Sequence, residues 1–202
     1  METNDGSPMT PAKISTATAS DAERVGDIMS AGFEADPVMC WVFGDDRRKK
    51  LKVMFEFLAE EGIAFGATHL LGGACAKWTP PNPPAWPTER VEGFMAAMGE
   101  VAQPDELGRL GAMENLMREH HPKEPHWYLG AVACEPVSQG RGLGSELLDH
   151  GLAVVDAGGM PAYLESTNPR NQSLYVRKGF EPVGEMPLPD GPSLTSMWRP
   201  AR

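Results

Sequence analysis

The chain has 202 residues, with 18 Lys and Arg against 28 Asp and Glu, and a formal net charge of −10 at pH 7. Its length suits one domain, and a hydrophobic share of 41% is enough for a sizeable core. The acidic balance argues against binding to nucleic acid or to an anionic membrane, because both need a basic footprint.

The cysteines and the N-terminal segment indicate which classes of protein can be excluded. Cys40, Cys75 and Cys134 are too few and too scattered for a disulfide framework or a zinc site, so we expect reduced thiols and no metal. No apolar run approaches the ~20 residues of a membrane span. Residues 1–12 lack the pattern of a signal peptide and are expected to form a loose tail. Residues 13–202 are expected to form a single cytoplasmic domain.

The N-terminal part begins with a predicted strand and helix. Lys13–Ala19 alternates as a strand does. Ser20 and Glu23 have the spacing of a capping box, which opens a helix that Asp36–Pro37 ends.

Three more helices are predicted from apolar spacing, at about Asp45–Phe65, Thr88–Glu100 and Pro104–Glu119. Arg47–Lys50, at the start of the first of these, is interpreted as a solvated helix face. Leu70–Thr79 predicts a hairpin, and the proline-rich segment after it predicts a surface loop that borders a pocket.

The C-terminal part predicts a β-α-β unit. His126–Cys134 reads as a strand, a glycine-rich loop follows, and an amphipathic helix runs from Leu143 to a stop at Gly158–Gly159. Pro161–Thr167 is the next predicted strand. The chain then ends with a short helix that closes at Gly179–Phe180 and two strands, near Glu181–Met186 and Leu194–Arg199.

The glycine-rich loop suggests an anion site. A helix N-terminus has unpaired N–H groups and a partial positive charge, and Gly140, Gly142 and Gly144 let a phosphate approach the backbone. The spacing is neither that of a dinucleotide fold nor that of a P-loop. On these residues alone, a tight strand-to-helix connection stays open.

Two motifs make the resemblance specific. Gln139, Gly142 and Gly144, spaced Q-x-x-G-x-G after an apolar strand, resemble the acyl-CoA signature of the GNAT superfamily of N-acyltransferases. The segment from Asn168 to Phe180 resembles that superfamily's N-x-x-A-x-x-L-Y-x-K-x-G-F motif.

This chain departs from the second motif at two places. Asn171 stands where a small residue is commoner, and Lys178 follows the usual lysine position, which Arg177 takes. The resemblance is strong over residues 126–180. It implies an α/β (α+β) fold, with a mixed, mostly antiparallel sheet flanked by helices and a splayed β-α-β cofactor site.

The resemblance also implies which residues bind acetyl-CoA. The pantetheine arm would pair with main-chain groups around Val132 and Cys134. The pyrophosphate would lie on the backbone of one loop, formed by Gln139, Gly140, Arg141, Gly142, Leu143 and Gly144. Asn168 would bind the arm or hold the strand end, and Asn171 belongs to the same cofactor set. For the side chain of Arg141, a phosphate contact and a solvated position are both open.

Tyr175 matches the superfamily's tyrosine, which donates a proton to the departing sulfur. A phenol has a pKa near 10 and stays protonated at neutral pH. A core tyrosine that closes the short helix is the alternative.

Glu165 is the candidate general base, since alternation puts it on one face with Tyr163 and Thr167. A structural ion pair is the alternative for Glu165. Three histidines and ordered water are other candidates for the base, and four tryptophans are candidates for an acceptor pocket or for the core. The histidines are His120, His121 and His126, and the tryptophans are Trp78, Trp86, Trp127 and Trp198.

The resemblance predicts an acyltransferase that moves an acetyl group from acetyl-CoA to a primary amine of a small molecule, by direct attack in a ternary complex. Acetylation of protein lysines or N-termini is a second interpretation, and it needs an open peptide groove. A non-catalytic acyl-CoA sensor is a third. We expect no nucleic-acid or membrane partner, and a homodimer is open by analogy alone.

Overall fold

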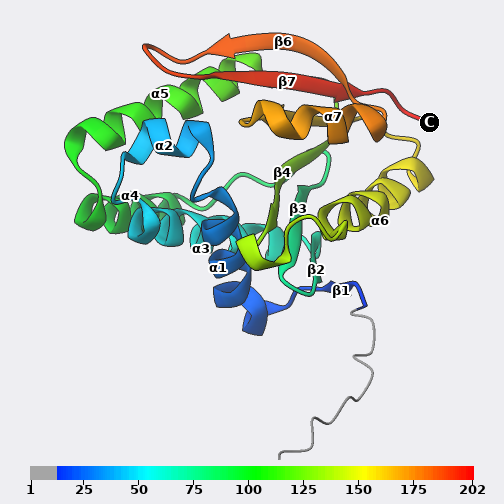
Figure 1. Cartoon of the computed structure of the whole chain (residues 1–202), viewed down its shortest axis with the longest axis horizontal. Helices are drawn as coiled ribbons and strands as arrows, with labels where there is room; N and C mark the ends of the chain where they lie inside the picture. The colour runs from blue at the N-terminus through cyan, green and yellow to red at the C-terminus, as the bar shows by residue number, and fades with distance from the viewer. Residues whose placement is uncertain (1–12) are drawn as a thin grey trace, which may run out of the picture.

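The computed structural model describes residues 13–202, in which seven strands form one sheet (Figure 1). The predicted tail, residues 1–12, lies outside the described residues. In sheet order the strands are β1 (Ser15–Thr16), β2 (Thr68–Leu71), β3 (Ala74–Thr79), β4 (Trp127–Cys134), β5 (Ala162–Ser166), β7 (Ser193–Arg199) and β6 (Glu181–Pro187). Only β4 and β5 pair in parallel, so the predicted mixed, mostly antiparallel sheet is confirmed.

Seven α-helices flank this sheet in the described part of the chain. They are α1 (Ala22–Phe33), α2 (Pro37–Phe43), α3 (Arg48–Ala64), α4 (Thr88–Val101), α5 (Pro104–His120), α6 (Leu143–Ala157) and α7 (Pro169–Arg177). Short 3₁₀ turns precede α1 and α6, at Ala19–Asp21 and Pro136–Ser138. No helix of residues 13–202 is long and apolar enough to cross a membrane.

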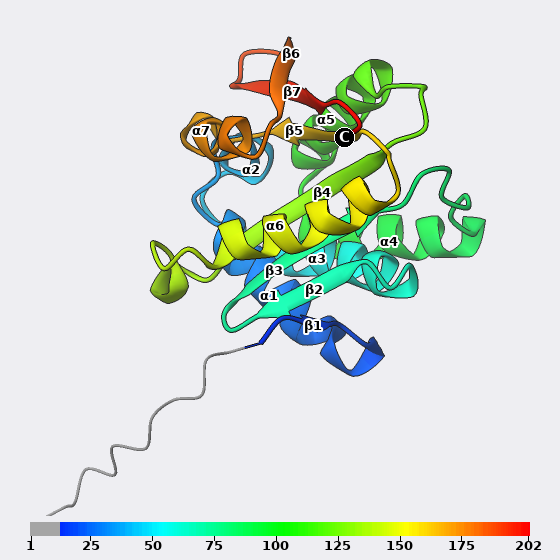
Figure 2. The same cartoon turned by 90° about the vertical axis from the view of Figure 1, so that its right-hand side faces the viewer.

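The sheet separates two apolar cores. Figure 2 shows α6 in front of β3 and β4, with α1 and α3 on the opposite face. The core under α6 contains Trp78, Leu147 and Leu148, and Gly151 lets this helix come close, because a Cβ there would clash with the Trp78 indole. The other core is formed mainly by α1, α2, α3 and α5. Every residue of β2 and β3 is buried, so both faces of these strands are covered, and even the polar Thr68, His69 and Lys77 are shielded from solvent.

The first helices differ from the prediction in two ways. The capping box is formed by Thr18 and Asp21, whose carboxylate accepts from the Thr18 N–H, so the proposed pair of Ser20 and Glu23 was wrong. Pro37 ends no helix but begins α2, where Asp36 accepts from the N–H groups of the first turn. Proline suits this position, because an N–H there has no helical partner.

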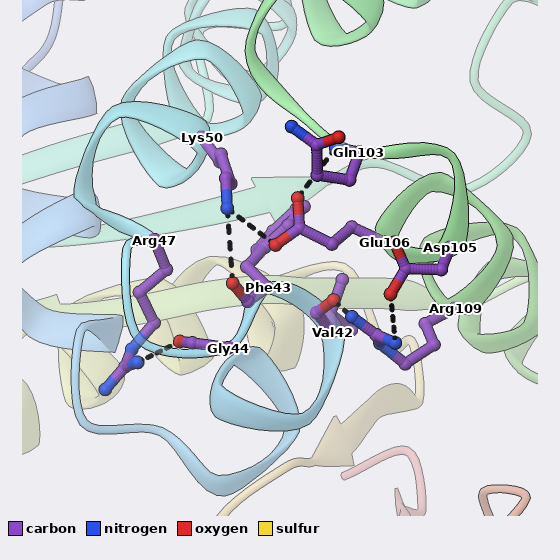
Figure 3. Close-up of polar contacts among 9 residues, drawn as sticks. All are labelled: Val42, Phe43, Gly44, Arg47, Lys50, Gln103, Asp105, Glu106 and Arg109. Carbon is purple, nitrogen blue, oxygen red and sulfur yellow. Dashed lines mark hydrogen bonds and ion pairs between the residues drawn. The ribbon is translucent and has the colours of Figure 1, made fainter.

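The basic run was also misread at its last residue (Figure 3). Lys50 is only 8% exposed, and its ammonium donates to Glu106 Oε1 at 2.6 Å and to the Phe43 carbonyl at 3.3 Å. The other Glu106 oxygen accepts from the Gln103 N–H and caps α5. This buried pair fastens the start of α5 to α2 and α3, and breaking such a pair typically costs about 3–5 kcal/mol.

The parallel strands β4 and β5 separate soon after they meet. Their register contains Trp127 opposite Ala162 and Tyr128 opposite Tyr163, whereas β4 pairs with β3 up to Cys134. After Tyr163, which pairs with Tyr128, the rest of β5 pairs only with β7 in the described residues. The carboxyl half of β4 therefore borders a V-shaped gap in the sheet, as the splayed β-α-β unit predicts.

Candidate functional site

The glycine-rich loop lies at the gap, between β4 and α6. Gly140 and Gly142 have φ of +74° and +81°, which favour glycine, and a Cβ at either would meet nothing within 4 Å. The first helical bond of α6 runs from the Glu146 N–H to the Gly142 carbonyl. The N–H groups from Gly140 to Ser145 thus precede the helical ladder and lie where an anion can approach them.

The predicted arm-binding positions lie beside this loop. The side chains of Val132 and Cys134 lie 3.7 Å from the place where a Cβ of residue 144 would stand, so the start of α6 packs directly against β4. Gln139 donates to the Cys134 carbonyl at 3.2 Å, and Arg141 is exposed. Burial raises the pKa of the Cys134 thiol. All three cysteines are free, as predicted.

Helix α7 brings Tyr175 and Asn171 to the wall of a cavity that reaches this gap. Tyr175 is buried, and desolvation together with the charge of Asp36 raises the pKa of its hydroxyl well above the usual value. The phenol therefore stays a proton donor at neutral pH. Asn168 caps α7, since its Oδ1 accepts from the Arg170 N–H at 3.1 Å.

Sequence reasoning missed Asp36. One oxygen caps α2, and the other accepts from the Thr167 hydroxyl at 2.7 Å, which ties the end of β5 to a segment 131 residues away. Burial raises the pKa of this carboxyl. The Asp36–Pro37 pair could have indicated this role, because Asp followed by Pro is typical of a helix start as well as of a helix end.

The cavity has a volume of about 850 Å³ and walls that are mostly apolar. Three aromatic rings cluster in its wall: the ring centroid of Phe57 lies 4.1 Å from that of Trp86 and 4.4 Å from that of Phe94. The proline-rich segment borders it, as predicted, with Pro80 and Pro83. Of the four candidate tryptophans only Trp86 lines the cavity. The other three, Trp78, Trp127 and Trp198, do not.

Glu165 is the most unusual group in the cavity wall. Its side chain is 1% exposed, and within residues 13–202 neither carboxyl oxygen has a hydrogen-bond partner. Burial and the Glu165 charge raise the pKa of the neighbouring Tyr128 and Tyr163 hydroxyls. No described Lys or Arg pairs with Glu165. The nearest ionisable nitrogen is Nδ1 of His121, 3.6 Å from Oε1, so an ion pair forms only when that histidine is protonated.

Two histidines connect Glu165 with the cavity mouth. Nε2 of His121 lies 3.2 Å from Nε2 of His126, whose Nδ1 lies 2.6 Å from the Glu124 carbonyl. Burial lowers the pKa of His126. His120 is exposed and does not line the cavity. No group of three or more His, Cys, Asp or Glu in the described chain is placed to hold a metal ion.

A second ionisable cluster was not predicted. Lys77 from β3 and Glu61 from α3 form a buried ion pair at 2.5 Å, and the Trp86 indole N–H also donates to Glu61. Glu114 from α5 faces the same cavity. Burial, and then the charge of Glu165, raise the pKa of Glu114. The cavity thus combines apolar walls with an excess of carboxylates.

Comparison with known proteins agrees with this geometry. The model of the acetyltransferase (GNAT) family matches residues 77–180, more than half of the chain. A solved structure of histone acetyltransferase HPA2 and related acetyltransferase from Corynebacterium glutamicum is 28% identical, with a TM-score of 0.70, over 96% of this chain and 98% of that one.

Two more distant structures share the fold. They are polyamine N-acetyltransferase of Drosophila melanogaster (16% identity, TM-score 0.60, 92% and 98% of the chains) and an agmatine N-acetyltransferase (16%, 0.59, 94% and 99%). GNAT enzymes use acetyl-CoA as a co-substrate. With the family match, the splayed strands and the glycine loop in agreement, the chain belongs to the GNAT family of acetyltransferases.

Proposed function

We propose that this protein transfers an acetyl group from acetyl-CoA to a primary amine of a small molecule, by direct attack in a ternary complex. The observation that carries the proposal is the pairing of two groups on one cavity wall. Glu165 is a buried carboxylate without a hydrogen-bond partner in the described chain, and Tyr175 is a buried phenol that stays protonated. One accepts a proton and the other donates one, as acyl transfer to an amine requires.

The residues around the gap fit an acyl-CoA. When bound, acetyl-CoA supplies an acyl thioester whose thiol is the leaving group. The free edge of β4 around Val132 and Cys134 offers main-chain groups to the amides of the pantetheine arm. The backbone from Gln139 to Gly144 offers N–H groups and open space to the pyrophosphate. Asn171 lies on the same wall, whereas the Asn168 oxygen is already used as a cap.

In this proposal Glu165 accepts a proton from the acceptor ammonium, directly or through one water, because only the neutral amine is a nucleophile. His121 gives the proton a way out, since it lies against Glu165 and its side chain is 37% exposed. Tyr175 donates its proton to the departing sulfur. Asp36 acts through another residue: by binding Thr167 it positions the end of β5.

The elements that border the cavity favour a small acceptor over a peptide. Helices α4 and α5 and the proline-rich segment supply most of its outer wall, whereas a protein substrate needs an open groove. Relatives of similar fold are named as acting on agmatine, polyamines and arylalkylamines, which are small amines. The three free thiols support a cytoplasmic location.

A thiol-release assay over panels of small amines, amino acids and peptides tests the function. We expect acetyl-CoA-dependent release of CoA with at least one class of small primary amine, and acetylated product of the matching mass. Turnover confined to peptides would replace the proposal by the protein acetyltransferase. Acetyl-CoA binding without any turnover would favour the sensor.

Gly142→Asp tests the cofactor loop. Acetyl-CoA at ~100 times its Kd stabilises the folded protein by about 2.7 kcal/mol if it binds only that state. A carboxylate at position 142 repels the pyrophosphate, so we expect the thermal shift to vanish. Gly159→Asp is the matched control, because Gly159 also has positive φ and open space but lies beyond the other end of α6. An undiminished shift in Gly142→Asp would remove this loop from the cofactor site.

A further inference from the structure

The charges inside the cavity do not balance. The ionisable side chains that line the cavity include Glu61, Lys77, Glu114 and Glu165. Lys77 neutralises Glu61 in their ion pair at 2.5 Å. Two carboxylates, Glu114 and Glu165, are left to face the same space. Four acids (Glu61, Glu114, Glu124 and Glu165) line the cavity against three bases (Lys77, Arg118 and Lys123), which favours a cationic ligand, and Glu114 and Glu165 offer it two separate carboxylates.

At the mouth of the cavity, Arg118 offsets part of the Glu114 charge. Arg118 follows Glu114 by one helical turn and attracts it, but the Arg118 guanidinium is exposed and bonds to Asn115. Lys123 and Glu124 contribute one charge of each sign. The two carboxylates thus repel each other across the cavity, which is why Glu165 raises the pKa of Glu114.

Glu114 occupies a position that packing would give to an apolar residue. It lies on the stripe of α5 formed by Leu107, Leu110, Met117 and His121, at spacings of three and four residues. All of these side chains line the cavity. Glu114 is exposed and lines the cavity, so its carboxylate is available to a ligand.

Glu165 is the independent sign of a ligand. It is almost wholly buried, lines the cavity and has no hydrogen-bond partner for either oxygen in residues 13–202. The wall around the two acids is apolar, with Met54, Phe57 and Leu58 from α3 and Met113 from α5. A chain of methylene groups between two cationic ends matches this pattern.

We infer that the acceptor is a small organic dication, in which an apolar spacer joins the reacting primary amine to a second cationic group, and that Glu114 binds the second group. The inference rests on the proposed function, because it assigns the reacting amine to Glu165. Glu114 then acts as a specificity residue: it contacts the acceptor and takes no part in the proton transfers.

The test compares linear diamines, from diaminopropane to diaminooctane, with the monoamine of each chain length. For the preferred length, we expect kcat/KM for the diamine to exceed that for the monoamine by about 10- to 100-fold, the effect of one hydrogen bond between charged groups. Glu114→Gln is expected to reduce this ratio by the same factor. Glu119→Gln, an exposed acid of α5 that does not line the cavity, is the matched control and should keep the ratio.

Each outcome decides between the claims. Equal use of diamines and monoamines by the native protein, or an unchanged ratio in Glu114→Gln, overturns the inference and leaves the proposed function intact. Calorimetry with CoA present separates the two claims further. Diamine binding that Glu114→Gln abolishes, without any acetylation, overturns the proposed function but supports the dication site. If the protein neither binds nor acetylates any diamine, the inference is overturned. Retention of the acetyl-CoA thermal shift shows that Glu114→Gln is folded.

Discussion

Glu165→Gln is expected to lower kcat/KM at neutral pH by about 10²- to 10⁴-fold, the usual contribution of a general base, while acetyl-CoA binding stays normal. Glutamine keeps the size of the side chain but accepts no proton as a carboxylate does. The acid limb of the pH profile of kcat/KM, which reports the ionisation of the base in the free enzyme, should disappear. Activity should recover as the pH approaches the pKa of the acceptor amine itself. The measurement is a pH–rate profile beside a calorimetric Kd for acetyl-CoA.

A structural role for Glu165 makes a different prediction. Loss of a buried partner costs about 1–3 kcal/mol, which lowers the melting temperature and leaves the shape of the pH profile unchanged. Glu165 makes no hydrogen bond of normal geometry within the described residues, and its polar neighbours are the Tyr128 and Tyr163 hydroxyls, so we expect only a small loss of stability. Glu181→Gln, on the exposed strand β6, is the control for removing one charge. An unchanged acid limb in a stable variant would transfer the base role to His121 or to ordered water.

Tyr175→Phe is expected to lower kcat by about 10- to 10³-fold and to leave acetyl-CoA affinity nearly unchanged. The ring and its packing against Phe180 remain, and only the proton donor is lost. Burial and Asp36 raise the pKa of Tyr175, so the phenol keeps its proton to a higher pH than the ordinary value of about 10. In the native enzyme, ionisation of Tyr175 should therefore cause no fall in kcat at any pH below about 10.

Acyl donors with more acidic thiols sharpen this test. Such thiols leave without a proton, so the loss in Tyr175→Phe should shrink as the leaving thiol becomes more acidic. Single-turnover kinetics with a slow amine ensures that chemistry, and not product release, is measured. An unaltered rate under these conditions would exclude Tyr175 as the acid.

The β-α-β unit could be predicted because its signals are local. The strand ending at Cys134, the glycines with positive φ and the amphipathic helix from Leu143 follow one another in sequence, and each forms for reasons contained in a few residues. Strand alternation likewise predicted that Glu165 faces the same side as Tyr163. Helix α2 was missed because Asp36–Pro37 has two local meanings, and only the packing of Val38 and Val42 in the core selects the helix start.

The charge pairs could not be predicted, since their partners come from distant elements. Lys50 reads as a surface residue until Glu106, 56 residues later, is placed against it. Lys77 lies in an apolar strand that gives no hint of Glu61. The acidic character of the cavity has the same origin: Glu61, Glu114 and Glu165 come from three elements, and only the folded chain brings them to one space.

The two residue pairs between β4 and β5 also decide how the sheet behaves as a folding unit. Strands β1 to β4 form one ladder and β5 to β7 another, joined in the described chain only near Trp127 and Tyr128. Without the co-substrate, backbone amides on the free edge of β4 are expected to exchange with deuterium faster than those of β3. A pantetheine arm in the gap covers that edge and links the ladders. Slower exchange there on binding would show that the co-substrate takes the place of a strand between the two ladders. Its binding free energy would then also stabilise the contact between the two halves of the sheet.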